Sequence, residues 1–290
     1  MISRSRLSLC CAGTLAAAFL GTDPLRASSL EEAFAPGRIA PQSAAQIVDR
    51  AFENLYGCDL EQALELVVRL DGKQIHGYEA KMARKHIGGA AHEVLHFVGV
   101  GEFRKLKLLR IERMDRSDDA FVYVPALINV RRISLAQRAD TILGTNLTLE
   151  DLSAQWVDRF EVVARGRDFV EREPVHTIGV RPLRPVGYDR AELLIADLDY
   201  AILETRYYRK GAAEPFKVGR ARRQWMRRSS GHVLPDRVVF ETLDGLQTEI
   251  RYHRRSVNPE LSDSLFSKSS LEGPLPLLRG KRPTPPEEAR

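Results

Sequence analysis

The chain has 290 residues, of which 43% are hydrophobic and 29% are charged, and its mean hydropathy is −0.28. This composition excludes a disordered chain and an integral membrane protein, and the length is enough for one large domain or two small ones with buried cores. A formal charge of +5 is too small to indicate a nucleic-acid partner by itself, and we expect none.

Residues 1–29 have the pattern of a secretory signal peptide. Arginines precede an apolar run over residues 7–20, which is too short to span a bilayer as a helix. Small residues favour cleavage after Ala27 or Ser29. We therefore expect export across the inner membrane and a location in the periplasm, with an uncleaved N-terminal anchor as the alternative.

Two of the three cysteines lie in this leader, so the cleaved chain keeps Cys58 alone and forms no internal disulfide. No histidine or lysine stands beside Cys58 in the sequence to lower its pKa. We expect a buried structural thiol at this position instead of a nucleophile.

The first predicted element is an amphipathic helix over residues 43–56, because its apolar residues recur on one face. Ser43 and Gln46 have the spacing of a capping box, and Gly57 is a candidate for a left-handed C-terminal cap.

From residue 64 the apolar period changes to two, which predicts a half-buried strand. Asp71-Gly72 and Gly88-Gly89 then predict turns before and after a strand over residues 73–87, so the chain begins an up-and-down meander. The further predicted strands cover residues 90–98, 103–113, 119–124, 127–133, 159–170, 175–183, 191–197, 201–209, 218–228, 235–243 and 247–254.

Two stretches depart from this regular pattern. Between residues 105 and 113 the apolar parity switches from Leu106 and Leu108 to Leu109 and Ile111, which predicts a bulge or bend. Residues 272–290 contain five prolines and no periodic pattern, so we expect a disordered tail. The predicted organisation is a leader over residues 1–29, a single domain over 30–271, and this tail.

Many antiparallel strands and few helices indicate an α+β, mostly β fold. A strongly curved antiparallel sheet, or open half-barrel, hides its inner apolar face when a few helices plug the concave side. Such a fold leaves an apolar cavity between sheet and helices.

The most specific chemical motif is His92-Glu93-Val94-Leu95-His96, which has the HExxH form of zinc proteases. The motif needs a helix, but glycines flank it and its neighbours are predicted strands. In a strand the two histidines lie roughly 13 Å apart, at about 3.3 Å per residue, and cannot share a metal ion. We expect a strand here and no metal site.

Other catalytic patterns are weak. Asp197 and Asp199 are expected in a polar turn between two strands, and no Gly-x-Ser-x-Gly elbow is present. No Walker or Rossmann glycine pattern indicates a nucleotide, so we expect no cofactor.

Six cations fall within residues 217–228, and they are expected on a solvated strand face. The functional alternative is contact with an anionic membrane surface or an acidic partner. The six are Lys217, Arg220, Arg222, Arg223, Arg227 and Arg228.

Several segments resemble the outer-membrane lipoprotein-sorting protein family, whose relatives include the LolA and LolB carriers. The central block is residues 122–127 (VYVPAL), 130–134 (VRRIS) and 143–152 (LGTNLTLEDL). Upstream, residues 97–102 (FVGVGE) are similar, and downstream so are 234–238 (LPDRV), 245–248 (GLQT) and 259–268 (PELSDSLFSK), so the resemblance covers residues 45–272.

The resemblance implies a curved sheet with a helical lid around an apolar cavity, and a protein that carries acyl chains across the periplasm, often beside an RND-type exporter of the inner membrane. The chain departs from the family pattern at three places. It has Asn146 where the family usually has aspartate, Leu149 where an aromatic is usual, and no tryptophan near Phe121.

The leading hypothesis is a non-enzymatic periplasmic carrier. It would bind the acyl chains of a lipid or lipoprotein in an apolar cavity and transfer them toward the outer membrane without covalent chemistry. Its candidate cavity residues are Phe97, Leu106, Leu108, Tyr123, Leu127, Ile133 and Leu147, with Arg131 and Arg132 as hydrogen-bond donors to a lid or headgroup. The alternatives are an envelope signalling or scaffold module that partners an RND-type exporter and, less favoured, a zinc hydrolase.

Overall fold

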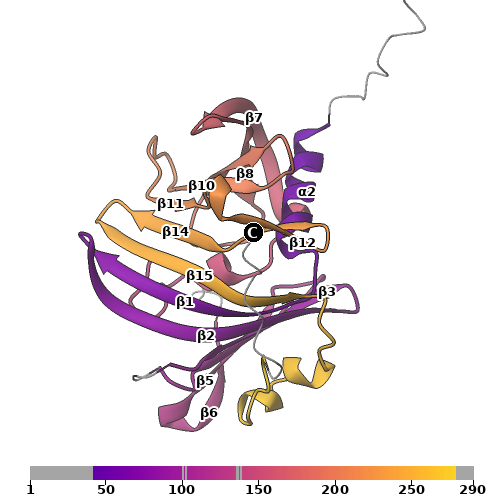
Figure 1. The fold of residues 1–290 in the computed structure, drawn as a ribbon, viewed down its shortest axis with the longest axis vertical. Coiled ribbons are helices and arrows are strands. Elements are labelled where there is room, and N and C mark those ends of the chain that lie inside the picture. The colour runs from indigo at the N-terminus through magenta and orange to yellow at the C-terminus, as the bar shows by residue number, and fades with distance from the viewer. Residues whose placement is uncertain (1–41, 100, 102, 135–136, 138, 279–290) are drawn as a thin grey trace, which may run out of the picture. The chain divides into compact units, whose positions relative to one another are not determined.

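The computed structural model describes residues 42–278 except 100, 102, 135–136 and 138. The expected leader lies outside the described residues. The predicted fold class is confirmed, because the described chain is mostly β and forms one antiparallel sheet of 13 strands that does not close (Figure 1). No helix of the described part is long and apolar enough to cross a membrane.

The elements of the large sheet are β1 (Leu60–Leu70), β2 (Lys73–Ile87), β3 (Ala90–Phe97), β4 (Lys107–Ile111), β5 (Asp119–Val124), β6 (Asn129–Arg132), β7 (Phe160–Val170), β8 (Glu173–Pro182), β9 (Arg190–Ala196), β10 (Ile202–Tyr208), β11 (Lys217–Arg220), β14 (Arg237–Thr242) and β15 (Leu246–Val257). The others are helix α2 (Ala44–Tyr56), the hairpin of β12 (Met226–Ser229) and β13 (His232–Pro235), and short 3₁₀ helices η1 (Pro125–Leu127), η2 (Glu150–Leu152), η3 (Val157–Arg159), η4 (Arg223–Trp225), η5 (Asp263–Phe266) and η6 (Ser269–Leu271).

The sheet consists of two meanders. They meet in the middle of the sheet, where its first strand in chain order, β1, lies beside its last, β15. Strands β1 to β6 form one meander, and β7 to β11 with β14 and β15 form the other. The two are joined where β15 pairs antiparallel with β1, with Leu66 opposite Ile250. Segments separated by most of the chain therefore become neighbours in the middle of the sheet.

Helix α2 packs on the concave side of the second meander. Its apolar face buries Ile47, Val48, Ala51 and Phe52 against strands β8 and β9. The predicted capping box of Ser43 and Gln46 is confirmed, with both reciprocal hydrogen bonds formed.

The expected left-handed cap at Gly57 is wrong, because its φ is −74°. The glycine is needed there for close approach. A Cβ on Gly57 would lie 2.6 Å from the Glu53 carbonyl oxygen, closer than two such atoms can come.

The bulge or bend expected in residues 105–113 lies at the beginning of that range and not at the parity switch. Two residues face one there: the Lys105 N–H donates to the Phe97 carbonyl and the Phe97 N–H donates to the Leu106 carbonyl, both at 2.9 Å. Strand β4 pairs with β3 and β5 in an unbroken register. The apolar parity switches because this strand is covered on both faces: Leu108 belongs to the core on the concave side and Leu109 to a core on the outer side. The irregular backbone lies just before the strand, where Lys105 has a φ of 70°.

The outer core is formed by the end of the described chain. Phe266, Leu271, Leu275 and Leu277 are buried against strands β2 to β5, and η5 and η6 lie beside these strands (Figure 1). Packing therefore continues through residues 272–278, the first part of the expected tail. The rest of that tail lies outside the described residues.

Candidate binding site

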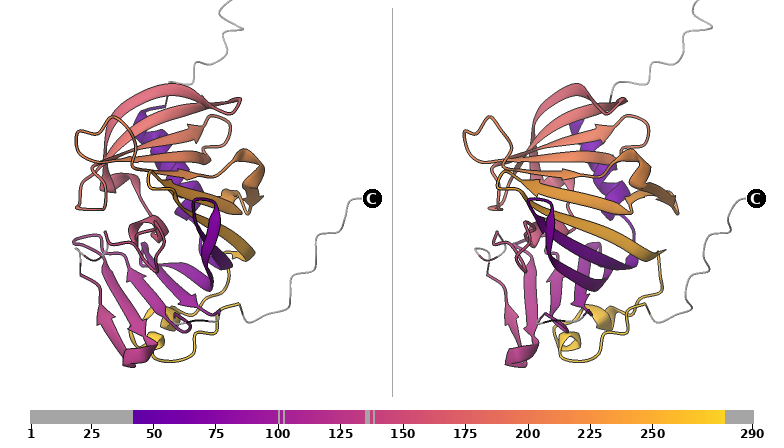
Figure 2. Two further views of the ribbon diagram at one scale, coloured as in Figure 1. Left: turned by 90° about the vertical axis from the view of Figure 1, so that its left-hand side faces the viewer. Right: turned by 60° about the vertical axis from the view of Figure 1, so that its left-hand side comes forward.

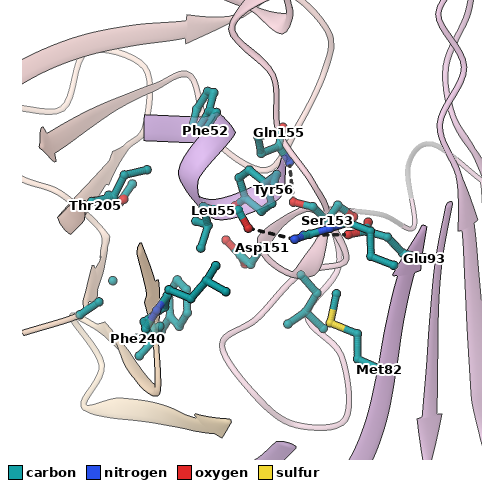
Figure 3. Close-up of a pocket in the computed structure, with 18 of the residues that line it drawn as sticks. Phe52, Leu55, Tyr56, Met82, Glu93, Asp151, Ser153, Gln155, Thr205 and Phe240 are labelled. Atoms are coloured by element: carbon teal, nitrogen blue, oxygen red, sulfur yellow. Dashed lines mark hydrogen bonds and ion pairs between the residues drawn. The ribbon is translucent and has the colours of Figure 1, made fainter. Parts of the chain in front are cut away.

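A cavity of about 200 Å³ lies on the concave face between helix α2 and the sheet. Figure 3 shows Phe52, Leu55 and Tyr56 of the helix on one side, and Phe240 of β14 and Met82 of β2 below them. Both meanders contribute apolar lining, including Leu95, Leu108, Leu193, Leu203, Leu234 and Val238. The lining is mostly hydrocarbon, which suits an apolar ligand.

The segment over residues 142–159, which we call the lid segment, crosses the concave face between the two meanders (Figure 2). Its Leu147 and Leu149 are buried in the core with Leu66 of β1 and Phe240 of β14. The lid segment also lines the cavity through Leu149 and Leu152. The lid segment therefore forms part of the cavity wall.

Asn146 fixes the first part of the lid segment. Its side-chain amide donates to the carbonyl oxygens of Phe240 at 3.0 Å and of Leu246 at 2.9 Å. Its backbone N–H donates to the hydroxyl of Thr248 at 3.2 Å. These bonds tie the lid segment to the turn between β14 and β15.

Asp151 fixes the middle of the lid segment through a buried ion pair. Its Oδ2 lies 2.6 Å from Nζ of Lys217 in β11, and the two side chains are 2% and 5% exposed. The same oxygen accepts from the backbone and the hydroxyl of Thr148. Burial, followed by the nearby Asp151 charge, raises the pKa of Tyr207 well above its usual value, so this phenol stays neutral.

A buried charge network fixes the end of the lid segment to the first meander. Arg110 of β4 contacts Glu93 of β3 at 2.8 Å and Asp118 at 2.6 Å, and Arg159 contacts Asp118 at 2.9 Å and Glu112 at 2.5 Å. Burial alone would raise the pKa of Asp118, but the two guanidinium groups outweigh it and lower that pKa to about 2.

The HExxH residues lie in strand β3, as predicted. His92 and His96 are on one face of the strand, and Glu93 is on the other, bound to Arg110. Burial, together with the nearby charges of Lys107 and Lys81, lowers the pKa of His96 to about 4. No three His, Cys, Asp or Glu side chains of the described chain are grouped to hold a metal ion.

The predicted cavity residues are divided between the two faces of the sheet. Leu108 lines the cavity, and Phe97, Leu106, Ile133 and Leu147 pack in the core beside it. Tyr123 faces the other way and packs in the outer core. Strand parity explains the division, since Tyr123 pairs with Lys107 while Val122 pairs with Leu108.

The other three predicted residues do not line the cavity, and a headgroup contact of the two arginines stays a prediction. Leu127 lies in the turn between β5 and β6 and is 50% exposed, because the chain reverses there at the sheet edge. Arg131 is exposed on the edge strand β6. Arg132 pairs with Asp119 at 2.5 Å and contacts neither the lid segment nor the cavity.

The basic cluster over residues 217–228 does not form a free cationic face. Lys217 is buried against Asp151, and the five arginines each have a carboxylate partner. These partners are Glu204 and Glu241 for Arg220, Glu171 for Arg222, Glu173 and Asp199 for Arg223, Asp236 for Arg227, and Asp199 for Arg228. Contact of this cluster with an anionic membrane surface stays a prediction, and the buried Lys217 cannot take part in it. Asp197 and Asp199 lie in the predicted turn between β9 and β10.

Sequence reasoning missed the half of the cavity that the second meander and helix α2 supply. Phe52, Leu55 and Tyr56 belong to the predicted helix, whose amphipathic pattern indicated burial without naming the surface it covers. The polar contacts of Asp151 with Lys217 span 66 positions in the sequence and carry no local signal.

No curated protein matches the chain. A protein-family model described as "Uncharacterized protein" matches residues 91–273, well over half of the sequence. The chain belongs to this family. Its described part also resembles several solved structures closely enough to compare their folds.

The first is an outer-membrane lipoprotein-sorting protein domain from Vibrio parahaemolyticus, titled putative, with a TM-score of 0.73 and 16% identity over 80% of this chain and 100% of that one. A DUF1329 family protein from Desulfovibrio piger has a TM-score of 0.72 and 21% identity, covering 79% and 97%. A LolA superfamily protein from Nitrosomonas europaea has a TM-score of 0.65 and 16% identity, covering 79% and 99%. The family resemblance found in the sequence is thereby confirmed as a LolA-like fold.

Proposed function

We propose that the protein is a periplasmic carrier that binds the acyl chains of a lipid or lipoprotein and transfers them toward the outer membrane without covalent chemistry. The observation that carries the proposal is the apolar cavity on the concave face, enclosed by helix α2 and the lid segment in a LolA-like fold. The expected leader supplies the route of export.

The energetics fit a carrier that must release its cargo. Burial of an acyl chain contributes about 0.8 kcal/mol per methylene, so binding strength grows with the length of chain enclosed. The cavity of about 200 Å³ is smaller than the roughly 300–1,000 Å³ of typical small-molecule pockets. A long acyl chain therefore needs the lid segment to move outward on loading, and the same movement allows release.

The proposal is tested by producing the exported chain, residues 30–290, in a bacterial periplasm and purifying it without detergent. Native mass spectrometry then detects co-purifying lipid, and elemental analysis detects zinc. We expect bound acyl lipid and no stoichiometric metal. An empty, metal-free protein would favour the signalling or scaffold module that partners a membrane exporter, and stoichiometric zinc would favour a hydrolase.

Two neighbouring residues of β14 provide a matched pair of variants. Val238 lines the cavity, whereas Val239 is the next residue of the same strand and does not. Val238→Trp fills the cavity and should abolish lipid retention. Val239→Trp adds the same volume outside the cavity and should retain lipid at the wild-type level. Equal loss in both variants would contradict the assigned site.

A further inference from the structure

Arg84 of β2 and Glu93 of β3 form one of the polar places in the cavity wall, called here the polar corner. Figure 3 shows Glu93 beside the apolar lining, across from the end of helix α2. The side chains of Arg84 and Glu93 are 3% and 7% exposed. Polar groups at such depth normally have all their hydrogen bonds satisfied, so their partners decide what the corner can bind.

Arg84 is held at the C-terminal end of helix α2. Its Nε donates to the Cys58 carbonyl at 3.2 Å and its Nη2 to the Leu55 carbonyl at 3.0 Å. Its Nη1 lies 3.7 Å from Oε1 of Glu93, which is too far for a hydrogen bond. The Arg84 guanidinium is therefore held in place by two carbonyls. Its Nη1 makes an ion-pair contact with Glu93 but donates no hydrogen bond to it.

Glu93 is also held in place, through its second carboxylate oxygen, Oε2. Oε2 accepts from Nη1 of Arg110 at 2.8 Å and from the backbone N–H of Ala154 at 3.1 Å. Oε1 is buried and receives no hydrogen bond from the described residues. The corner thus presents a donor and an acceptor, 3.7 Å apart, on rigid neighbouring strands.

The charged groups at the polar corner are already paired. Arg84, Arg110 and Arg159 stand against Glu93, Glu112 and Asp118 in one connected network, and the more exposed Arg184 joins it 4.0 Å from Asp118, outside the cavity lining. The other charged groups of the lining are paired too: Asp151 with Lys217, Arg255 with Asp236, and Glu204 with Arg206 and Arg220. Every cation among the described lining residues therefore already has a carboxylate partner and is not free to pair with an ionised ligand group.

We propose that the polar corner selects a neutral group that both donates and accepts, a hydroxyl or an amide, on the hydrocarbon chain in the cavity. This inference rests on the proposed carrier function and specifies its ligand class. A hydroxyl or amide donates to Oε1 of Glu93 and accepts from Nη1 of Arg84. An ionised carboxylate or phosphate can accept from Arg84, but it also lies against the Glu93 carboxylate. Because Arg84 already pairs with Glu93, the ligand's charge is desolvated without a counter-charge of its own.

The test compares three ligands with the same 12-carbon chain: dodecanol, dodecanamide and dodecanoate. Their binding to the delipidated chain is measured at pH 8 by displacement of the neutral dye N-phenyl-1-naphthylamine. We expect the alcohol and the amide to bind about tenfold more tightly than the ionised acid. Dodecanoate should approach the alcohol as the pH is lowered and its carboxyl group becomes protonated.

Glu93→Gln supplies a charge-neutralisation test at nearly the same volume. If the amide oxygen keeps the contacts of Oε2, the amide nitrogen replaces the Oε1 acceptor, and the network gains one net positive charge. The preference should then shift toward dodecanoate by about tenfold or more relative to wild type. Glu161→Gln, the same change at an exposed carboxylate of β7 outside the cavity lining, is the control and should keep the wild-type order.

The wild-type comparison decides the inference even where Glu93→Gln fails to fold. Dodecanoate binding as tightly as dodecanol at pH 8 would overturn the selectivity and leave the carrier proposal standing. Failure of the dye and all three ligands to bind would instead overturn the carrier proposal itself. A Glu93→Gln variant that folds and keeps the wild-type order would remove Glu93 from the recognition of the ligand.

Discussion

Asn146 shows how a single buried residue depends on the partners around it. The resembling family usually has an aspartate at this position, but both partners of the Asn146 side-chain nitrogen are carbonyl oxygens, of Phe240 and Leu246. A carboxylate has no donor to offer them, whereas an amide has two. The asparagine therefore matches the way the lid segment contacts the turn between β14 and β15 in this chain.

Asn146→Asp should lower the free energy of unfolding by about 2–3 kcal/mol at pH 7, because it leaves two buried carbonyls and a buried charge without partners. Burial would raise the pKa of the new carboxyl above its unfolded value. The loss should therefore be largest above that folded pKa and shrink as the pH falls and the acid is protonated. Urea denaturation at pH 7 and pH 4.5 measures this, with the exposed Asn129→Asp as control. A variant as stable as wild type at pH 7 would contradict the contact.

His96 makes the stability of the protein depend on pH. Burial, with Lys107 and Lys81, lowers its pKa to about 4 in the folded state, while an unfolded histidine titrates near 6.5. Between these two values the unfolded chain binds the extra proton, so stability falls as the pH is lowered from about 6.5 to about 4. His96 is partly exposed, so solvent screening limits the effect to the order of 1 kcal/mol.

Replacing His96 by glutamine should remove that part of the pH dependence. The difference in unfolding free energy between pH 7 and pH 4.5 should be smaller for His96→Gln than for wild type. The exposed His253→Gln serves as the control and should leave the difference unchanged. If both variants follow the wild-type profile, another group is responsible for the acid sensitivity.

The lid segment is held more by buried polar contacts than by helical structure. It contains two short 3₁₀ helices, η2 and η3, and its anchors are Asn146, the Asp151–Lys217 pair and the charge network that ends at Arg159. Each anchor joins it to a different part of the sheet. A segment held at a few polar points can be released locally while the sheet stays folded.

Lys217→Met should loosen the lid segment by leaving the Asp151 carboxylate buried without its cation. We expect a loss of roughly 3 kcal/mol in unfolding free energy and faster amide hydrogen exchange over residues 143–156. Adding Asp151→Asn to this variant should recover part of the loss, because no charge is then unpaired.

Arg220→Met is the matched control for Lys217, in the same strand. Arg220 is 42% exposed and pairs with Glu204 and Glu241 at the surface, so its loss should cost at most about 1 kcal/mol and leave exchange in the lid segment unchanged. Equal effects of the two variants would show that the Asp151–Lys217 pair does not hold the lid segment.

Across the whole described chain, the strands could be predicted from the sequence much better than the cavity. Alternation within a strand is local, so β2, β5 and β7 to β10 lie within a few residues of their predicted positions. The segment predicted as one strand over residues 218–228 instead divides into β11, η4 and β12, because the chain leaves the sheet after Arg220.

The cavity depends on contacts between residues far apart in the sequence, for which the sequence carries no local pattern. It forms where the pairing of β1 with β15 brings the second meander beside the first, and Tyr207 and Phe240 then meet Leu108 on one concave face. Sequence reasoning named residues from the first meander and the block that resembles the family. Of these, Leu108 alone appears among the described lining residues, since the pairing that completes the wall is not encoded locally.

The outer core gives the end of the described chain a structural role for the whole first meander. Strands β2 to β5 have apolar residues on both faces, and the outward-facing set includes Ala83, Val94 and Leu109. This set is covered by Leu271, Leu275 and Leu277. The side chain of Lys107 in β4 also donates to the Leu271 carbonyl at 2.7 Å. Without that cover the sheet would expose a continuous apolar surface, which favours aggregation.

Leu277→Ala tests this cover at its last buried residue. Leu277 is 1% exposed, and truncation of a buried leucine costs about 2–5 kcal/mol, so we expect a loss in this range and a lower unfolding midpoint in urea. The neighbouring Pro276 is exposed, and Pro276→Ala should change the midpoint little. The cavity lies on the opposite face, so Leu277→Ala should still bind dodecanol under conditions where it remains folded. A Leu277→Ala protein as stable as Pro276→Ala would show that the segment beyond η6 does not stabilise the sheet.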